Sequence, residues 1–215
     1  MSDVQAGESS RRRRIYSDAP RVERGYSPLK IGIFAGTFDP VHDGHIEVAK
    51  TAVKFLMLDK LYFMVEESPW TAKKPVNVKY RKAMVELALS DNQNLELLNM
   101  TDKRFDVSTT LLKIEQLLPD SEFYFIFGAD VFLNMNSANW QGLDKLLKHN
   151  IVVFERGKIS ESDISKHAKK LGVALAILPS AHPHHSSSVV RLTHNNRTLW
   201  VPKTVAQFIK DNAIY

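Results

Sequence analysis

Two histidines three residues apart, His42 and His45, are the side chains whose types and spacing point most directly to chemistry. They end a segment that reads Gly36-Thr37-Phe38-Asp39-Pro40-Val41-His42-Asp43-Gly44-His45. At a helix entrance, residues three apart share one face, so both imidazoles can face the same phosphate. Donors held in place stabilise the charge that builds on phosphate oxygens during phosphoryl or nucleotidyl transfer. The pair therefore predicts a phosphate-transfer site.

The glycines of this segment favour an anion beside the two rings. Gly36 lets backbone N–H groups approach a bound anion, and Gly44 keeps the helix entrance clear of side chains. Unpaired N–H donors at that entrance carry a partial positive charge. The spacing alone leaves open two helix-start histidines with ordinary hydrogen bonds. An apolar run before the segment and a helical pattern after it favour the phosphate site.

A second candidate phosphate contact lies near the end of the chain, in the segment Ser186-Ser187-Ser188-Val189-Val190-Arg191. Serines at a helix start can cap the helix and can also donate to phosphate oxygens. Arg191, about one turn later, supplies a planar fork of donors. A plain serine cap followed by a surface arginine is the alternative interpretation.

The elements that must position these residues follow from alternating apolar runs and helical patterns, which indicate βαβ units. The expected strands are 31–34, 61–65, 95–100, 123–127, 151–154 and 173–178. Helical patterns begin at Ile46 and near Met84, cover 109–118 and, after Pro202, cover 203–213. We expect an α/β fold, a Rossmann-like doubly wound parallel sheet of about six strands. Ligands of such sheets bind beyond the carboxyl ends of the strands.

Composition limits the class of protein. The chain has 215 residues and no Cys, which excludes disulfides, thiolate nucleophiles and Cys-ligated zinc. His182, His184 and His185 are interrupted by Pro183 and have no acidic ligand nearby, so we expect no metal site there. No apolar run approaches the roughly 18 residues of a membrane span, and the first residues lack the apolar core of a secretory signal. We expect a cytoplasmic protein that does not contact membranes.

Charge sets the first residues apart from the rest. The net charge is +5, so the surface should attract anions. Residues 1–29 contain four consecutive arginines, Arg11 to Arg14, and no helical or strand period. We interpret them as a flexible basic extension, a solvated tail rather than a nucleic-acid contact, and place one folded domain at 30–215.

The two phosphate segments resemble the signatures of the HIGH-type nucleotidyltransferase superfamily. The first matches Gly-Thr-Phe-Asp-Pro-x-His-x-Gly-His, and the second resembles Ile-Ser-Ser-Thr-x-Ile-Arg, with His185, Ser188 and Val190 replacing Ile, Thr and Ile. The resemblance implies a Rossmann-like fold and ATP as substrate, with Mg²⁺ as the cofactor. It implies catalytic roles for His42, His45 and Arg191. The residues it assigns to ATP binding are Gly36, Thr37, Phe38, Gly44, Ser186, Ser187 and Ser188.

Later segments are similar to the nicotinate mononucleotide adenylyltransferases. These segments are the Gly128-Ala129-Asp130 triplet, Trp140, the apolar strand that leads to Arg156, and the tail from Val201-Pro202 to Tyr215. The resemblance implies that Trp140 packs on the pyridine ring and that Asp130 contacts the nucleotide. Judged by residue type alone, Trp140 could be a half-buried packing residue and Asp130 a helix cap. The substrate-binding residues implied are Gly128, Asp130, Trp140, Arg156, Lys73 and Ser108.

Two segments depart from that family and leave the preferred pyridine open. Residues 68–74 replace Pro-Pro-His-Lys and lack its histidine. Residues 105–111 resemble Ser-Tyr-Thr-x-Asp-Thr-Leu only in part, with Val107 or Ser108 at the first threonine. Lys73, Lys74 and Arg81 could meet the mononucleotide phosphate, although a solvated surface position is the expectation for each.

The predicted function is transfer of AMP from ATP to nicotinate mononucleotide, which forms the deamido-NAD dinucleotide and pyrophosphate in NAD biosynthesis. The alternatives are a relative that acts on nicotinamide mononucleotide, phosphopantetheine or glycerol phosphate, and a noncatalytic nucleotide-binding regulator. The expected partners are the small-molecule substrates; we expect no nucleic acid, and a homo-oligomer stays open.

Overall fold

The computed structural model describes residues 27–68, 74–100, 102–180, 186–192 and 200–215. Within them, six parallel strands form one sheet in the order β3-β2-β1-β4-β5-β6. The strands are β1 (Leu29–Gly36), β2 (Lys60–Val65), β3 (Leu95–Leu97), β4 (Ser121–Gly128), β5 (Asn150–Phe154) and β6 (Leu175–Leu178). This is the doubly wound order of Rossmann-like folds, so the predicted fold class is confirmed.

The sheet is buried on both faces, which explains why its strands are continuous apolar runs. Ile33, Phe125 and Ile151 lie side by side on three neighbouring strands and face one core. Their successors in the chain, Phe34, Ile126 and Val152, pack in the core on the opposite face. The alternation arises because successive side chains of a strand point to opposite faces.

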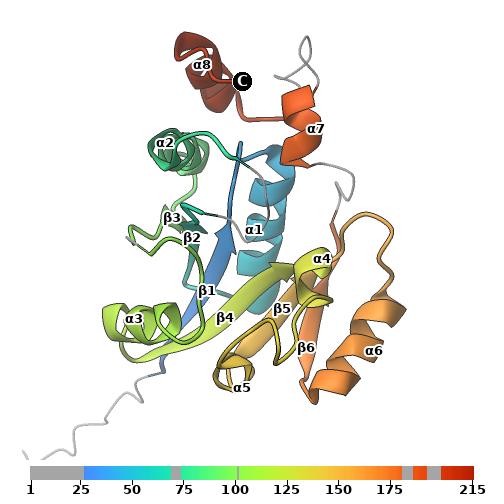
Figure 1. Cartoon of the computed structure of the whole chain (residues 1–215). Helices are drawn as coiled ribbons and strands as arrows, with labels where there is room; N and C mark the ends of the chain where they lie inside the picture. Colours follow the sequence, from blue (N-terminus) through green and yellow to red (C-terminus); the bar gives the residue numbers. More distant parts are fainter. Residues whose placement is uncertain (1–26, 69–73, 101, 181–185, 193–199) are drawn as a thin grey trace, which may run out of the picture.

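Helices cover both faces and make a three-layer molecule (Figure 1). One face carries α1 (Asp43–Leu56), α2 (Val78–Leu89), α7 (Ser187–Leu192) and α8 (Lys203–Asp211). The other face carries α3 (Thr110–Leu117), α4 (Ala129–Phe132), α5 (Leu143–Leu146) and α6 (Glu161–Leu171). None of the helices in the described ranges is long and apolar enough to cross a membrane.

Several element boundaries differ from the sequence expectations. The third strand ends at Leu97 rather than at residue 100, and the sixth begins at Leu175 rather than at 173. The helix α6, which the sequence analysis missed, begins after a capping box between Ser160 and Asp163 and buries Ile164 and Ala168. Residues 1–26 lie outside the described residues, so the extension stays a prediction.

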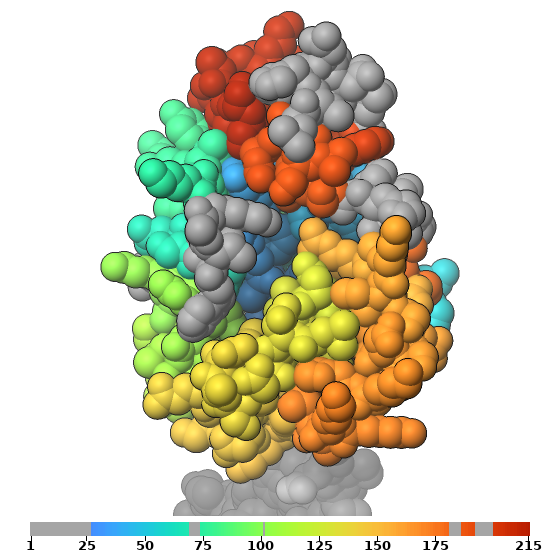
Figure 2. All heavy atoms as spheres, turned by 45° about the vertical axis from the view of Figure 1, so that its right-hand side comes forward, coloured from blue at the N-terminus to red at the C-terminus, as the bar shows by residue number. Residues whose placement is uncertain are grey.

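The strand order places a crevice between two halves of the molecule. From β1 the chain proceeds outward to β2 and β3, and it then returns to β4 on the other side of β1. The loops that follow β1 and β4 therefore leave the sheet in opposite directions, which opens a site at their carboxyl ends. Figure 2 shows a hollow there, with blue residues at its floor, the colour of β1 and of the segment that follows it.

Candidate active site

A cavity of about 260 Å³ occupies this crevice. Its lining comes from the loop after β1, the ends of β2, β4 and β5, the loops at Phe105 and Trp140, and the first turns of α7. His45, Arg191 and Trp140 all line it, although they come from distant parts of the sequence. The structure thus brings the two phosphate segments and the tryptophan to one cavity.

The two imidazoles stack at the entrance of α1, where His42 is the N-cap residue. Their ring centroids lie 3.6 Å apart, with planes inclined by 25°. His45 lines the cavity, whereas His42 is buried behind it and is not part of the lining. His42 therefore packs behind the His45 ring, on the side away from the cavity.

The protonation state of His45 follows from its surroundings. The backbone N–H of His42 donates to Nδ1 of His45 at 3.2 Å, so a neutral ring carries its proton on Nε2. Burial, and then the nearby His42 and Arg156, hold the pKa of His45 well below its ordinary value. His45 is thus a neutral hydrogen-bond donor at physiological pH.

Phe38 shapes the wall beside this ring. Its backbone lies in the left-handed region, with φ of 48°, which is uncommon for a residue with a bulky side chain. The Phe38 ring meets His45 edge-on at a centroid distance of 5.0 Å and lies against Gly36. A Cβ atom at Gly36 would lie 3.1 Å from that ring, so a side chain there would push the ring back by a few tenths of an ångström.

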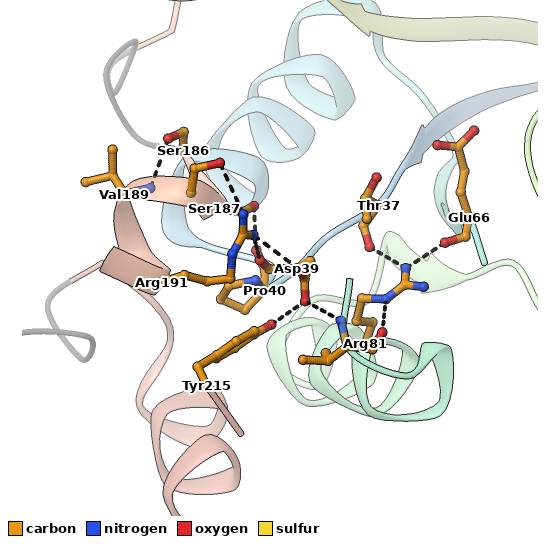
Figure 3. A network of polar contacts seen from close by, with 12 residues as sticks. Thr37, Asp39, Pro40, Glu66, Arg81, Ser186, Ser187, Val189, Arg191 and Tyr215 are labelled. Atoms are coloured by element: carbon orange, nitrogen blue, oxygen red, sulfur yellow. Dashed lines mark hydrogen bonds and ion pairs between the residues drawn. The ribbon is translucent and has the colours of Figure 1, made fainter. Parts of the chain in front are cut away.

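Arg191 reaches the first motif from α7 (Figure 3). Its guanidinium donates to the backbone carbonyl of Asp39, to Oδ2 of Asp39 at 3.2 Å and to Oγ of Ser188 at 3.2 Å. The other Asp39 oxygen, Oδ1, accepts the hydroxyl of Tyr215 at 2.6 Å. These bonds hold the guanidinium at the cavity with a fixed orientation.

The serines before Arg191 have different positions. Ser187 and Ser188 line the cavity, and the Ser187 hydroxyl donates to the carbonyl of Pro40 at 2.9 Å. Ser186 lies outside the lining; its Oγ accepts the N–H of Val189 at 3.3 Å, which is the serine cap weighed from the sequence. Ser186 therefore caps the helix, while Ser187 and Ser188 line the cavity.

The expectation that Arg81 is a solvated surface cation is wrong. Its side chain is 1% exposed, and its guanidinium donates to four backbone carbonyls. These carbonyls belong to Thr37, Glu66, Glu67 and Val76, at distances of 2.6 to 2.9 Å. Figure 3 shows the guanidinium between the loops that follow β1 and β2. Arg81 joins these loops rather than facing solvent.

Aromatic residues line another part of the cavity, which we call its aromatic end: Phe105, Phe127 and Trp140. The Trp140 ring meets Phe127 edge-on at 5.8 Å and lies 6.3 Å from Phe105. Trp140 lines the cavity while it packs on these rings, so it is a packing residue, and its contact with the pyridine ring stays a prediction.

An ion pair lies beside the aromatic residues. Asp130, in the first turn of α4, lies 3.6 Å from the guanidinium of Arg156, and both line the cavity. A Cβ atom at Gly128 would lie 2.6 Å from the Asp130 carboxylate, so the absence of a side chain there allows this approach.

Some predicted site residues lie outside the lining. Gly44 is buried at the start of α1, and Ser108 is exposed, with its N–H donating to Asp106 at 2.8 Å. Lys73 lies outside the described residues. The sequence analysis gave no role to Glu66, which lines the cavity; its place directly after a predicted strand was a usable signal.

Comparison with known proteins shows relatives over most of the chain. A family model described as cytidylyltransferase-like matches residues 33–193. A probable nicotinate-nucleotide adenylyltransferase of Clostridium botulinum is 32% identical over 197 residues, which cover 86% of this chain and 98% of the relative. The chain belongs to the nicotinate-nucleotide adenylyltransferase family. A probable family member of Bacillus licheniformis is also 32% identical, over 194 residues and with the same coverage.

The fold of this family member has a solved counterpart. The nicotinic acid mononucleotide adenylyltransferase of Plasmodium falciparum, in complex with NaAD, superimposes with a TM-score of 0.71. The match covers 87% of this chain and 97% of that protein, at 19% sequence identity. This likeness confirms the fold. The family model and the relatives at 32% identity confirm the family resemblance inferred from the motifs, and the chain is a nucleotidyltransferase.

Proposed function

We propose that this enzyme transfers the AMP part of ATP to nicotinate mononucleotide and releases pyrophosphate. The observation that carries the proposal is one cavity lined by a donor imidazole, a guanidinium and an indole, from His45, Arg191 and Trp140. The first two groups suit phosphate oxygens, and the indole offers a flat face to an aromatic ring. The substrate named for the relatives has both a phosphate and a pyridine ring.

The geometry suggests how the transfer proceeds. ATP lies with its phosphates between the entrance of α1 and the first turn of α7, and the phosphate of the acceptor attacks the α-phosphate in line. The Nε2–H of His45 donates to oxygens that gain charge. Arg191 and the hydroxyl of Ser188 hold the leaving pyrophosphate, and the hydroxyl of Ser187 joins them when it leaves the Pro40 carbonyl. The protein forms no covalent intermediate.

The Mg²⁺ of the reaction enters with ATP as part of the substrate. Mg²⁺ prefers oxygen ligands and is commonly held by phosphates, one or two carboxylates and water. Within the described ranges, no group of three or more His, Cys, Asp or Glu side chains could hold a metal ion. The Asp39 carboxylate is engaged by Arg191, Tyr215 and the N–H of Val76. The phosphates themselves would therefore supply most of the ligands.

The test is pyrophosphate release from ATP and Mg²⁺ with separate acceptors: the nicotinate and nicotinamide mononucleotides, phosphopantetheine and glycerol phosphate. Release with a pyridine mononucleotide, together with a dinucleotide product of matching amount, is the expected result. Release only with phosphopantetheine or glycerol phosphate would assign the chain to another activity. ATP binding without release would indicate a regulator. The cytoplasmic location and a homo-oligomeric state stay predictions.

A further inference from the structure

Glu66 is an acidic side chain at the aromatic end of the cavity. It follows β2 directly and lines the cavity with Phe105 and Trp140. Its Oε1 accepts the backbone N–H of Phe105 at 3.0 Å, which fixes the carboxylate beside the rings. The residue is partly buried, and burial raises its pKa above the ordinary value for Glu.

In the part of the chain that the structure describes, no cationic group lies at contact distance from this carboxylate. Among the residues that the structure describes, Glu66 forms no ion pair. Arg104 and Arg81 act on it only as nearby charges, and the guanidinium of Arg81 donates to the backbone carbonyl of Glu66 rather than to its carboxylate. At a pH above this raised pKa, a ligand at the aromatic end therefore meets an anionic group.

That charge distinguishes the two pyridine acceptors. Nicotinate mononucleotide carries a ring carboxylate, whereas nicotinamide mononucleotide carries a neutral carboxamide in the same place. An anionic wall repels the carboxylate, and its free oxygen can accept from the NH₂ of the carboxamide. Repulsion of one ligand is a common source of specificity.

We propose that Glu66 is a specificity-determining residue, which weakens the preference for the nicotinate acceptor and lets nicotinamide mononucleotide serve as a second substrate. This inference rests on the proposed function, because it requires the pyridine ring to lie at the aromatic end. Glu66 would act through charge, since its hydrogen bond to Phe105 is available to a neutral amide as well.

The test compares kcat/KM for the two acceptors in the unmodified protein, Glu66→Gln and Glu67→Gln. Glutamine keeps an acceptor for the Phe105 N–H and removes the charge. Glu67 is the matched control, because it is adjacent, exposed and absent from the cavity lining. The nicotinate-to-nicotinamide ratio of kcat/KM is expected to rise about tenfold in Glu66→Gln and to stay within about twofold in Glu67→Gln.

Three results would overturn the inference. They are no release with nicotinamide mononucleotide, an unchanged ratio in Glu66→Gln, and an equal shift in both variants. If circular dichroism shows that Glu66→Gln is unfolded, Glu66→Ser takes its place, and the same tenfold change in the kcat/KM ratio is expected. If neither pyridine acceptor gave pyrophosphate release, the proposed function would be refuted as well. If pyrophosphate were released but the nicotinate-to-nicotinamide ratio of kcat/KM did not change in Glu66→Gln, only the role of Glu66 would be refuted.

Discussion

At the scale of single residues, the tautomer of His45 determines whether its ring can donate a hydrogen bond into the cavity. A backbone N–H occupies Nδ1, and the depressed pKa keeps the ring neutral. The ring is then a donor through Nε2, suited to oxygens whose charge grows during the reaction. A cationic histidine would bind the ground-state triphosphate more strongly, but burial disfavours that form.

Replacing His45 by Ala is therefore expected to lower kcat by about 10² to 10³, as for loss of one preorganised donor, with a much smaller change in the KM for ATP. Steady-state pyrophosphate release at varied ATP measures both parameters. Equal losses in kcat and in ATP affinity would show that His45 binds the ground state and the transition state alike.

At the scale of elements, Arg81 of α2 determines how two loops meet. Its guanidinium joins the carbonyls of Thr37, after β1, with those of Glu66 and Glu67, after β2. The loop with the phosphate motif and the loop with Glu66 are thus fixed to each other. The helix organises both ends of the cavity.

Arg81→Met is expected to lower the free energy of unfolding by about 2 to 4 kcal/mol, because buried carbonyls lose their donor. Urea denaturation measures the loss. Lys79→Met on the same helix is the control, since Lys79 is exposed and should change stability by less than about 0.5 kcal/mol. A neutral effect of Arg81→Met would show that the loops hold their positions without the guanidinium.

The helices and strands could be predicted from the sequence more readily than the hydrogen bonds of Arg81 to backbone carbonyls. The apolar runs of β1, β4 and β5 predict buried parallel strands. The motif and its flanking patterns place His45 at a helix entrance. Arg81 could not be assigned in this way, because its partners are backbone carbonyls and carry no residue-type signal. Its position on the buried side of α2 depends on how two loops pack, which no local pattern encodes.

At the scale of the whole molecule, stability should depend on pH through His45. Its folded pKa lies below the unfolded value of about 6.5, so below that pH the unfolded chain binds a proton that the folded protein does not. Stability is therefore lost as the pH falls. Urea denaturation at pH 7.5 and at pH 5.5 measures how much the free energy of unfolding falls between them. This fall should be smaller in His45→Gln than in the unmodified protein, by about 1 kcal/mol. An identical loss in both proteins would mean that the His45 ring is freely protonated.

The fold as a whole serves to bring two distant segments to one cavity. Parallel strands with a reversal between β1 and β4 place the entrance of α1 opposite the first turn of α7. Asp39 links them, because its carboxylate accepts Arg191 while its loop leads to the imidazoles. His45 and Arg191 should therefore act on one bound triphosphate.

A double-mutant cycle on kcat/KM for ATP, with His45→Ala, Arg191→Ala and the double variant, tests that claim most directly. If both groups stabilise one transition state, the double variant should lose much less than the product of the single losses, with a coupling of about 1 kcal/mol or more. Losses that multiply without coupling would contradict the account, because the imidazole and the guanidinium would then act independently.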